Sequence, residues 1–213
     1  LAAGPVVALL PGSRAGELKY IGPAFIEAAR WIAERMPDVQ FVSPAASPDT
    51  REIFENLCRS AGAAGMIRVV AGQARQVLAA ADVVLLASGT ATLETMLFMR
   101  PMIVAYRVAP ITAWLLRVSG IVKIELFSLP NLLAGRMLVP EFIQEQVVGA
   151  DMGEALLELL QREEVRNTQL QEFAHLGALL RQSASHRAAN AVADLLSDRN
   201  LLGAHAGLSS ERQ

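Results

Sequence analysis

The chain has 213 residues, of which 53% are hydrophobic, so it can bury a substantial core as one large domain or as one domain with helical extensions. Its formal net charge of -2 and aromatic content of 5% offer no general attraction for phosphates and few stacking platforms, so we exclude nucleic acid as a partner. No apolar run approaches the length of a membrane span, and the N-terminus lacks the pattern of a signal peptide. We expect a soluble or peripheral protein that is part of a longer chain, because Leu1 leads almost directly into a strand.

The first half of the sequence alternates between strand and helix patterns. Three strands and two helices are predicted there, with the strands at 6–10, 39–43 and 67–71 and the helices at about 23–36 and 47–59. Pro23 suits the first turn of the earlier helix, whose apolar residues recur at helical spacing. Ser47 offers capping chemistry to the later one.

The second half continues this alternation and then becomes helical. Strands are predicted at 83–87 and 102–105, and helices from 151 to about 202. Residues 151–154 resemble a capping box. Short continuous apolar strands are expected where both faces of a parallel sheet are covered. We therefore predict an α/β fold, a Rossmann-like doubly wound parallel sheet over residues 1–165, with helices over 166–202 and a flexible tail over 203–213.

Few residues outside the turns suggest acid, base or nucleophilic chemistry. Cys58, the single cysteine, lies in an amphipathic helical pattern and fits a reducing compartment. We expect it to pack in the core; a catalytic thiol is the alternative, but no nearby histidine or basic cluster would lower its pKa. The three histidines, His175, His186 and His205, fall in the C-terminal helices or tail and are interpreted as structural or solvated.

A tight turn follows the first strand and contains Gly12, Ser13 and Arg14. At such a turn backbone N–H groups and the positive end of a helix dipole converge, and small residues let a diphosphate approach. Arg14 adds a fixed positive charge. The alternative is a plain turn before a helix.

A second turn of this kind follows the strand at 83–87. Ser88, Gly89 and Thr90 provide hydroxyls and a flexible amide, and Glu94 on the ensuing helix places a carboxylate within reach of a ribose. The alternative is a helix cap followed by a solvated glutamate. Two such turns in one chain predict a nucleotide site.

A third unusual segment covers residues 128–136, where Pro130 and Gly135 bracket Asn131 and the segment ends in Arg136. A turn explains the proline and glycine, whereas the amide and guanidinium suit directed bonds to sugar or phosphate oxygens.

Between Arg100 and Arg136 the basic residues are Arg100, Arg107, Arg117, Lys123 and Arg136, and Glu125 is the only acid. This stretch is either core with solvated arginines or a surface for an anionic acylated substrate or an anionic membrane.

The sequence from residue 7 to about 160 resembles the C-terminal, nucleotide-sugar-binding half of the lipid A disaccharide synthases, glycosyltransferases of the two-Rossmann (GT-B) architecture. The matching stretches are 9–17, 88–94, 101–107, 128–136 and 140–145. The last three are far more specific for the family than a glycine-containing turn. The resemblance covers most of this chain but only about half of a family member.

The resemblance implies an inverting transfer of 2,3-diacylglucosamine from its UDP derivative to 2,3-diacylglucosamine 1-phosphate, without metal or cofactor. By this resemblance Arg14 and Asn131 are catalytic, Glu94 binds ribose, and the remaining substrate-binding residues are Gly12, Ser13, Ser88, Gly89, Thr90, Arg136 and Gln144. The expected partners are UDP-diacylglucosamine, the acylated monosaccharide phosphate and an anionic membrane surface. The expected location is cytoplasmic, peripheral to the inner membrane.

The family's N-terminal domain, with the acceptor site and the carboxylate base, is absent from these residues. Asp82 is not a substitute base, because it precedes its strand and should lie at the wrong end of the sheet. Two alternatives stay open: another GT-B enzyme such as a UDP-sugar epimerase, against which segment 128–136 argues, and a non-catalytic nucleotide-sugar-binding module. The terminal helices could pack on their own domain, on the missing one or on a second protomer in a homodimer.

Overall fold

A computed structural model describes residues 4–107, 126–181 and 189–195 of the chain. Two compact units are distinguished along the chain, residues Leu1–Leu176 and Gly177–Gln213. The first unit contains the sheet. The expected tail over 203–213, most of the expected helical stretch beyond residue 181, and His186 and His205 lie outside the described residues.

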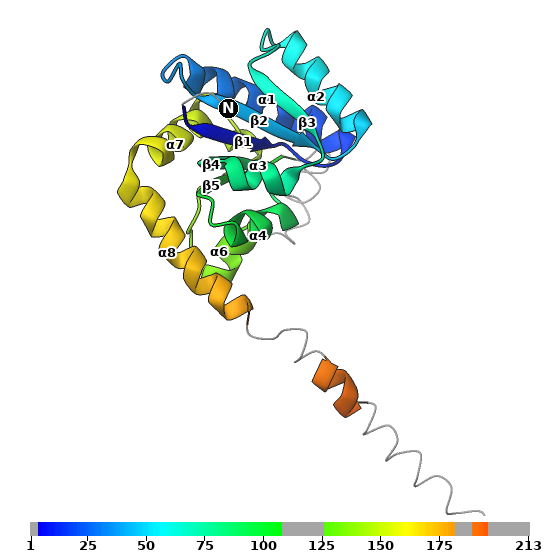
Figure 1. Cartoon of the computed structure of the whole chain (residues 1–213), viewed down its shortest axis with the longest axis vertical. Coiled ribbons are helices and arrows are strands. Elements are labelled where there is room, and N and C mark those ends of the chain that lie inside the picture. Colours follow the sequence, from blue (N-terminus) through cyan, green and yellow to red (C-terminus); the bar gives the residue numbers. More distant parts are fainter. Residues whose placement is uncertain (1–3, 108–125, 182–188, 196–213) are drawn as a thin grey trace, which may run out of the picture. The chain divides into compact units, whose positions relative to one another are not determined.

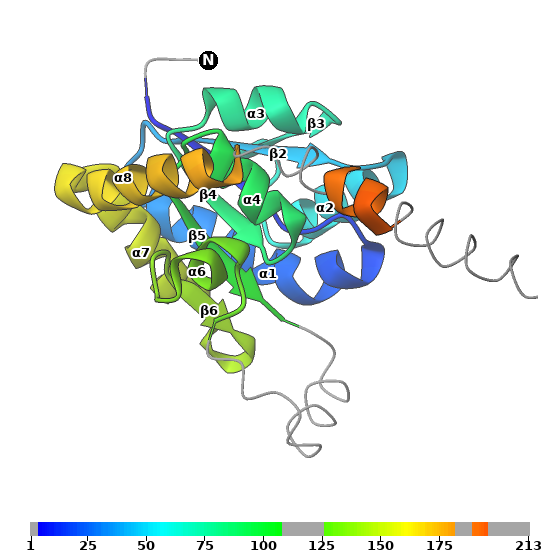
Figure 2. The ribbon, with the colours of Figure 1, turned by 90° about the horizontal axis from the view of Figure 1, so that it is seen from below.

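Six parallel strands of the described residues form one sheet in the order β3-β2-β1-β4-β5-β6; Figure 1 labels β1 to β5 and Figure 2 labels β6. The strands are β1 Val6–Leu10, β2 Gln40–Ala45, β3 Ile67–Ala71, β4 Val83–Ala87, β5 Met102–Tyr106 and β6 Glu141–Ile143. The order reverses between β1 and β4, which is the point at which such sheets open a crevice at their carboxyl ends. The predicted doubly wound parallel sheet is confirmed, and the short edge strand β6 adds to it.

Helices cover both faces of this sheet. They are α1 Ala15–Ala33, α2 Pro48–Ser60, α3 Ala74–Ala80, α4 Thr90–Leu97, α6 Leu129–Ala134, α7 Gly149–Gln161 and α8 Glu163–Leu180. Figure 2 shows α1 and α3 on opposite sides of the strands. Strand residues alternate between the two sides: Val7 and Leu85 pack with residues of α1, α2 and α7, whereas Ala8 and Leu86 pack with residues of α3, α4 and α8. Burial on both faces explains the continuous apolar strands of the sequence.

Two helix starts differ from the sequence prediction. Helix α1 begins at Ala15, so Pro23 lies inside it and not in its first turn. Leu18 and Ile21, both 2% exposed, extend the apolar stripe towards the N-terminus, and Pro23 is tolerated because it faces solvent, although its missing N–H removes one backbone bond. Helix α7 begins at Gly149, and no side chain among the described residues caps it, so the capping box predicted at 151–154 is wrong. By contrast, Ser47 caps α2 as predicted.

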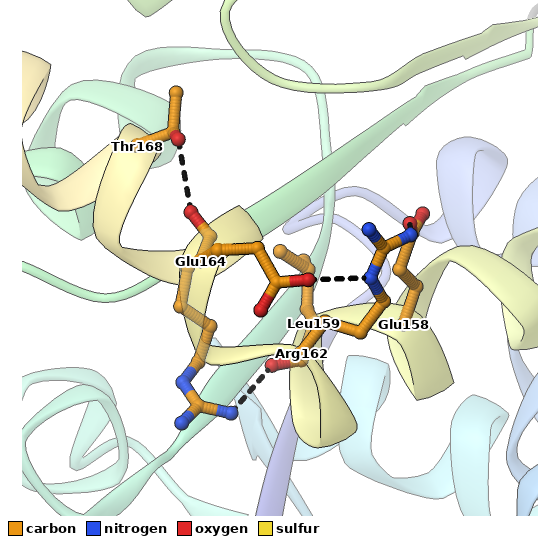
Figure 3. A network of polar contacts seen from close by, with 6 residues as sticks. Glu158, Leu159, Arg162, Glu164 and Thr168 are labelled. Carbon is orange, nitrogen blue, oxygen red and sulfur yellow. Dashed lines mark hydrogen bonds and ion pairs between the residues drawn. The ribbon is translucent and has the colours of Figure 1, made fainter.

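A polar network closes the junction between α7 and α8 (Figure 3). Arg162 pairs with Glu158 at 2.6 Å and with Glu164 at 2.9 Å. Arg166 donates to the backbone oxygens of Leu159 and Leu160 at the end of α7. The two Arg166 bonds satisfy carbonyls that a helix end leaves unpaired, where the chain turns into α8.

None of the helices in the described ranges combines the length and apolarity that a bilayer-spanning segment needs.

Buried Gln169 fastens α8 to the sheet. Its Oε1 accepts from the Met102 N–H at 2.9 Å, and its Nε2 donates to the Met102 oxygen at 3.2 Å. The side chain is 3% exposed and takes the place of a strand partner at the start of β5, which β6 is too short to cover.

We expect Gln169→Leu to lower the free energy of unfolding by about 2–4 kcal/mol, because it leaves the buried N–H and C=O of Met102 without partners. Urea denaturation measures the change. The matched control is Gln171→Leu on the exposed side of the same helix, which should change stability little. Equal stability of the two variants would contradict the assigned role of Gln169.

Candidate functional site

A cavity of about 440 Å³ lies at the carboxyl ends of the central strands. We call it the turn pocket. The residues that line it are Leu10, Gly12, Ser13, Arg14, Glu17, Pro44, Ala45, Ala46, Gly72, Ala74, Ala87, Ser88, Gly89, Thr90 and Ala91. The six turn residues that the sequence singled out, 12–14 and 88–90, therefore come together in one cavity. Their role in binding stays a prediction.

The first turn is shaped by a glycine and a glutamate. Gly12 has φ +118°, and a Cβ built there would lie 2.6 Å from Glu17 Oε2, so a larger residue would be both strained and obstructed. Glu17 Oε2 accepts from the Ser13 N–H at 3.2 Å, and Glu17 Oε1 pairs with Arg14 Nη1 at 2.9 Å. The Arg14 side chain is 82% exposed. Its guanidinium is thus held at the pocket while it stays accessible.

The second turn presents the start of α4. Gly89 is the N-cap residue, and within the described chain no side-chain oxygen accepts from the first amides of the helix, although the Thr92 N–H donates to the Gly89 backbone oxygen at 3.1 Å. Ser88 is fixed from two sides: its N–H donates to the Ala105 oxygen at 2.9 Å, and its Oγ donates to the Phe127 oxygen at 3.3 Å. An uncapped helix start beside Arg14 makes the pocket attractive to anions.

Glu94 lies one turn into α4 but does not line the pocket. Its Oε1 pairs with Arg75 Nε of α3 at 3.2 Å, and the two side chains are 40% and 80% exposed. The predicted contact with a ribose stays a prediction. The alternative, a solvated glutamate, also stays open, because the ion pair with Arg75 lies at the surface.

Sequence reasoning missed the pocket wall that β2 and β3 supply. Residues 44–46 and Gly72 line the pocket because the carboxyl ends of these parallel strands point to the same edge as those of β1 and β4. Gly72 and Gln73 both have left-handed backbones, with φ +61° and +60°, and they lead into α3. The sequence held enough information to find this wall, because both strands were predicted and ligands bind at the carboxyl ends of parallel strands.

Asn131, which the sequence placed between two turn-forming residues, is completely buried at 0% exposure in the short helix α6. Its Oδ1 accepts from the backbone N–H groups of Leu138 and Val139 at 2.7 and 2.8 Å. Its Nδ2 donates to the Val139 oxygen at 2.9 Å and to Glu141 Oε1 at 2.7 Å, with Met137 Sδ at 3.3 Å. The amide is thus committed to the chain that links α6 to β6.

Glu141 completes this network. Its two oxygens accept from the backbone N–H groups of Phe127 and Ser128, both at 2.8 Å, in addition to the bond from Asn131. The Phe127 ring stacks on Tyr106 with centroids 5.8 Å apart, and the Phe127 oxygen accepts from Ser88. The edge strand β6 is thereby connected, through one carboxylate, to the second turn of the pocket.

Arg136 and Gln144, two further predicted substrate-binding residues, do not line the pocket. Arg136 pairs with Glu172 of α8 at 2.8 Å. Gln144 has φ +52° at the start of a 3₁₀ turn, Gln144–Gln146, and its backbone oxygen accepts from Arg107 Nε at 3.2 Å. Their contacts with substrate stay predictions.

Two arginines of the expected basic surface bond to the protein's own backbone. Arg107 also donates to the Val147 oxygen at 2.5 Å, and Arg100 donates to the Ala79 oxygen at 2.9 Å. Arg117 and Lys123 lie outside the described residues. Contact with an anionic membrane therefore stays a prediction, and Arg107 is unsuitable for testing it because a charge reversal there would break backbone contacts.

The remaining ionisable candidates lie away from the pocket. Asp82 accepts from the Val6 N–H at 2.8 Å at the amino ends of the strands, the wrong end for the site, as predicted. Cys58 is 4% exposed, and burial, with a smaller contribution from Glu55, raises the pKa of its thiol to about 11. Cys58 is therefore a neutral packing residue. Among the described residues no group of three or more acidic, histidine or cysteine side chains could hold a metal ion.

The sequence is similar to a known protein family and to curated members of it. Residues 2–195 match the family model described as lipid-A-disaccharide synthetase. A lipid-A-disaccharide synthase of Hahella chejuensis is 47% identical over 195 residues, which are 92% of this chain and 48% of the relative. A second, from Chromohalobacter salexigens, is 47% identical over 192 residues, covering 90% of this chain and 49% of the relative. The chain thus spans about half the length of these curated relatives.

Solved structures with low identity share the fold. The glycosyltransferase WaaG, involved in lipopolysaccharide biosynthesis, superposes with a TM-score of 0.55 at 16% identity over 84% of this chain and 44% of WaaG. A UDP-GlcNAc 2-epimerase from Neisseria meningitidis, bound to UDP-GlcNAc, gives 0.51 at 15% identity over 84% of this chain and 43% of the epimerase. At such identities these neighbours establish the architecture alone.

Proposed function

This chain belongs to the lipid-A-disaccharide synthetase family, and we propose that it is the half of a glycosyltransferase that binds the nucleotide-sugar donor. The observation that carries the proposal is the turn pocket, in which Arg14 and the uncapped start of α4 face one cavity at the switch point of the sheet. A diphosphate is the ligand chemistry that such an arrangement favours.

The proposed chemistry is stabilisation of a leaving diphosphate. When the bond between the sugar and the UDP breaks, negative charge grows on the departing phosphate oxygen. Arg14 and the amides at the start of α4 would attract that charge, and their interactions strengthen as it develops. We propose UDP-2,3-diacylglucosamine as donor and 2,3-diacylglucosamine 1-phosphate as acceptor, with inversion at the transferred sugar. We assign the general base to the half of the relatives that these residues do not match.

We propose that Asn131 is a positioning residue and not one that contacts the donor. Both polar atoms of its side chain bond to groups within the segment 131–141. Glu141 in turn holds the Phe127 N–H, and the Phe127 oxygen holds the Ser88 hydroxyl in the pocket. Residues 128–136 would therefore support the phosphate turn from behind. This role replaces the direct contact expected from the sequence.

The first test separates binding from transfer. We expect residues 1–213 alone to bind UDP in calorimetric titration, because both turns are present in them. We expect them to transfer no sugar in a radiolabelled assay with donor and acceptor, because they correspond to only about half of the relatives' length. The matched control is the full-length protein, which should do both. Absence of UDP binding would contradict the proposed pocket. Disaccharide formation by the isolated chain would contradict the division of labour, and UDP binding with no transfer by the full-length protein would favour a non-catalytic module or an epimerase.

Arg14→Ala in the full-length enzyme should lower turnover roughly 100-fold or more, in line with the loss of one directed contact to developing charge. The fold should be unaffected, because the side chain is 82% exposed. Arg51→Ala is a suitable control, since Arg51 forms a comparable exposed ion pair with Glu55 on α2, away from the pocket. Unchanged turnover in Arg14→Ala would show that Arg14 only forms the turn.

Asn131→Ala should behave differently, losing stability as well as turnover. It leaves the buried N–H groups of Leu138 and Val139 without an acceptor, at a cost of about 2–4 kcal/mol in unfolding free energy. Urea denaturation of this variant, next to Asn167→Ala on the exposed side of α8, measures the effect. Full stability combined with lost turnover would instead restore a direct contact between Asn131 and the substrate.

A further inference from the structure

A carboxylate lies on the same groups that the proposed function assigns to a phosphate. Glu17, in the first turn of α1, lines the turn pocket. One of its oxygens accepts from the Ser13 N–H at 3.2 Å, and the other pairs with the Arg14 guanidinium at 2.9 Å. The carboxylate also fills the space beside Gly12, where a Cβ would stand 2.6 Å from Glu17 Oε2. The two donors of the first turn that the proposed function assigns to a phosphate are therefore already bonded to a carboxylate of the protein itself.

Helix capping explains only part of this arrangement. A glutamate in the first helical turn commonly bonds back to the N–H of the N-cap residue, which in α1 is Arg14. Glu17 instead reaches one residue further, to Ser13, and also engages the guanidinium. Capping alone does not require the charged contact with Arg14, the side chain best placed to meet a phosphate.

Glu17 and a bound diphosphate compete for the same donors. A carboxylate oxygen and a phosphate oxygen both prefer guanidinium and backbone N–H donors, and two anions placed on one turn repel each other. The contacts of Glu17 are also easy to exchange. Its side chain is 37% exposed and that of Arg14 is 82% exposed, and exposed ion pairs are weak.

We propose that the Glu17 carboxylate competes with the diphosphate for the Ser13 N–H and the Arg14 guanidinium. By this competition Glu17 assists the release of the diphosphate. This inference rests on the proposed function of the turn pocket. Binding of the diphosphate exchanges the carboxylate for phosphate oxygens on the same two donors, and departure of the nucleotide allows the carboxylate to return. Glu17 thus sets how tightly the turn holds a charged product, without taking part in the transfer itself.

Calorimetric titration of this chain and its Glu17→Gln variant with UDP and with uridine tests the proposal. Glutamine keeps an oxygen that can accept from the Ser13 N–H but has no charge. We expect Glu17→Gln to bind UDP about 3- to 10-fold more tightly than the wild type, and to bind the uncharged uridine with little change. The control is Glu34→Gln at the end of the same helix, which alters net charge equally on a side chain that is 68% exposed, away from the pocket. It should leave both affinities unchanged.

Each outcome has a distinct meaning. If the wild-type chain fails to bind UDP, the proposed function fails. If the wild type binds UDP but Glu17→Gln binds it equally or more weakly, or gains as much for uridine as for UDP, the competition is overturned while the pocket stands. If the Glu17→Gln variant does not fold, a measurement on the wild-type chain tests the competition instead. Its Ser13 amide resonance should move as UDP saturates the chain, because the acceptor changes from carboxylate to phosphate, and an unmoved resonance would overturn the proposal.

Discussion

The parallel pairing of β1 with β4, from Val7 opposite Val83 to Leu10 opposite Leu86, sets two segments beside each other that lie far apart in the sequence. Both strands are buried on both faces, so a register slip would move every side chain into the opposite layer of helices. That constraint fixes where each strand ends. Because the turns at 11–14 and 88–89 follow those ends directly, the pocket depends on the pairing of two apolar strands more than on any polar contact within it.

A second layer of order reaches the pocket from the edge of the sheet. Glu141, on the short strand β6, holds the backbone of Phe127 and Ser128, and the Phe127 oxygen then holds the Ser88 hydroxyl. Asn131 braces the same carboxylate from α6. These bonds are partly buried, and the loss of any one member leaves its partner unpaired in a place that water reaches only in part. Polar residues outside the cavity can therefore govern its shape.

Charges at and near the pocket are balanced in pairs. Arg14 is paired with Glu17 at the first turn, and Glu94 is paired with Arg75 beside the second. Both pairs are exposed and weak, so a charged ligand could exchange with them at little cost. The rigid features are the backbone turns and the sheet, whereas the charged side chains are the adjustable ones.

The apolar runs and turn residues of the sequence were sufficient to predict strands β1 to β5, the doubly wound sheet and the meeting of residues 12–14 with 88–90, because apolar patterning and turn chemistry are visible in short stretches of the chain; the edge strand β6 was not predicted. Several features could not be predicted in this way. The start of α1 at Ala15, the burial of Asn131 and the pairing of Glu94 with Arg75 depend on partners distant in sequence. Asn131 shows the reason. Its amide suits a ligand and a buried network equally well, and only the tertiary structure, by placing Leu138, Val139 and Glu141 around it, decided between them.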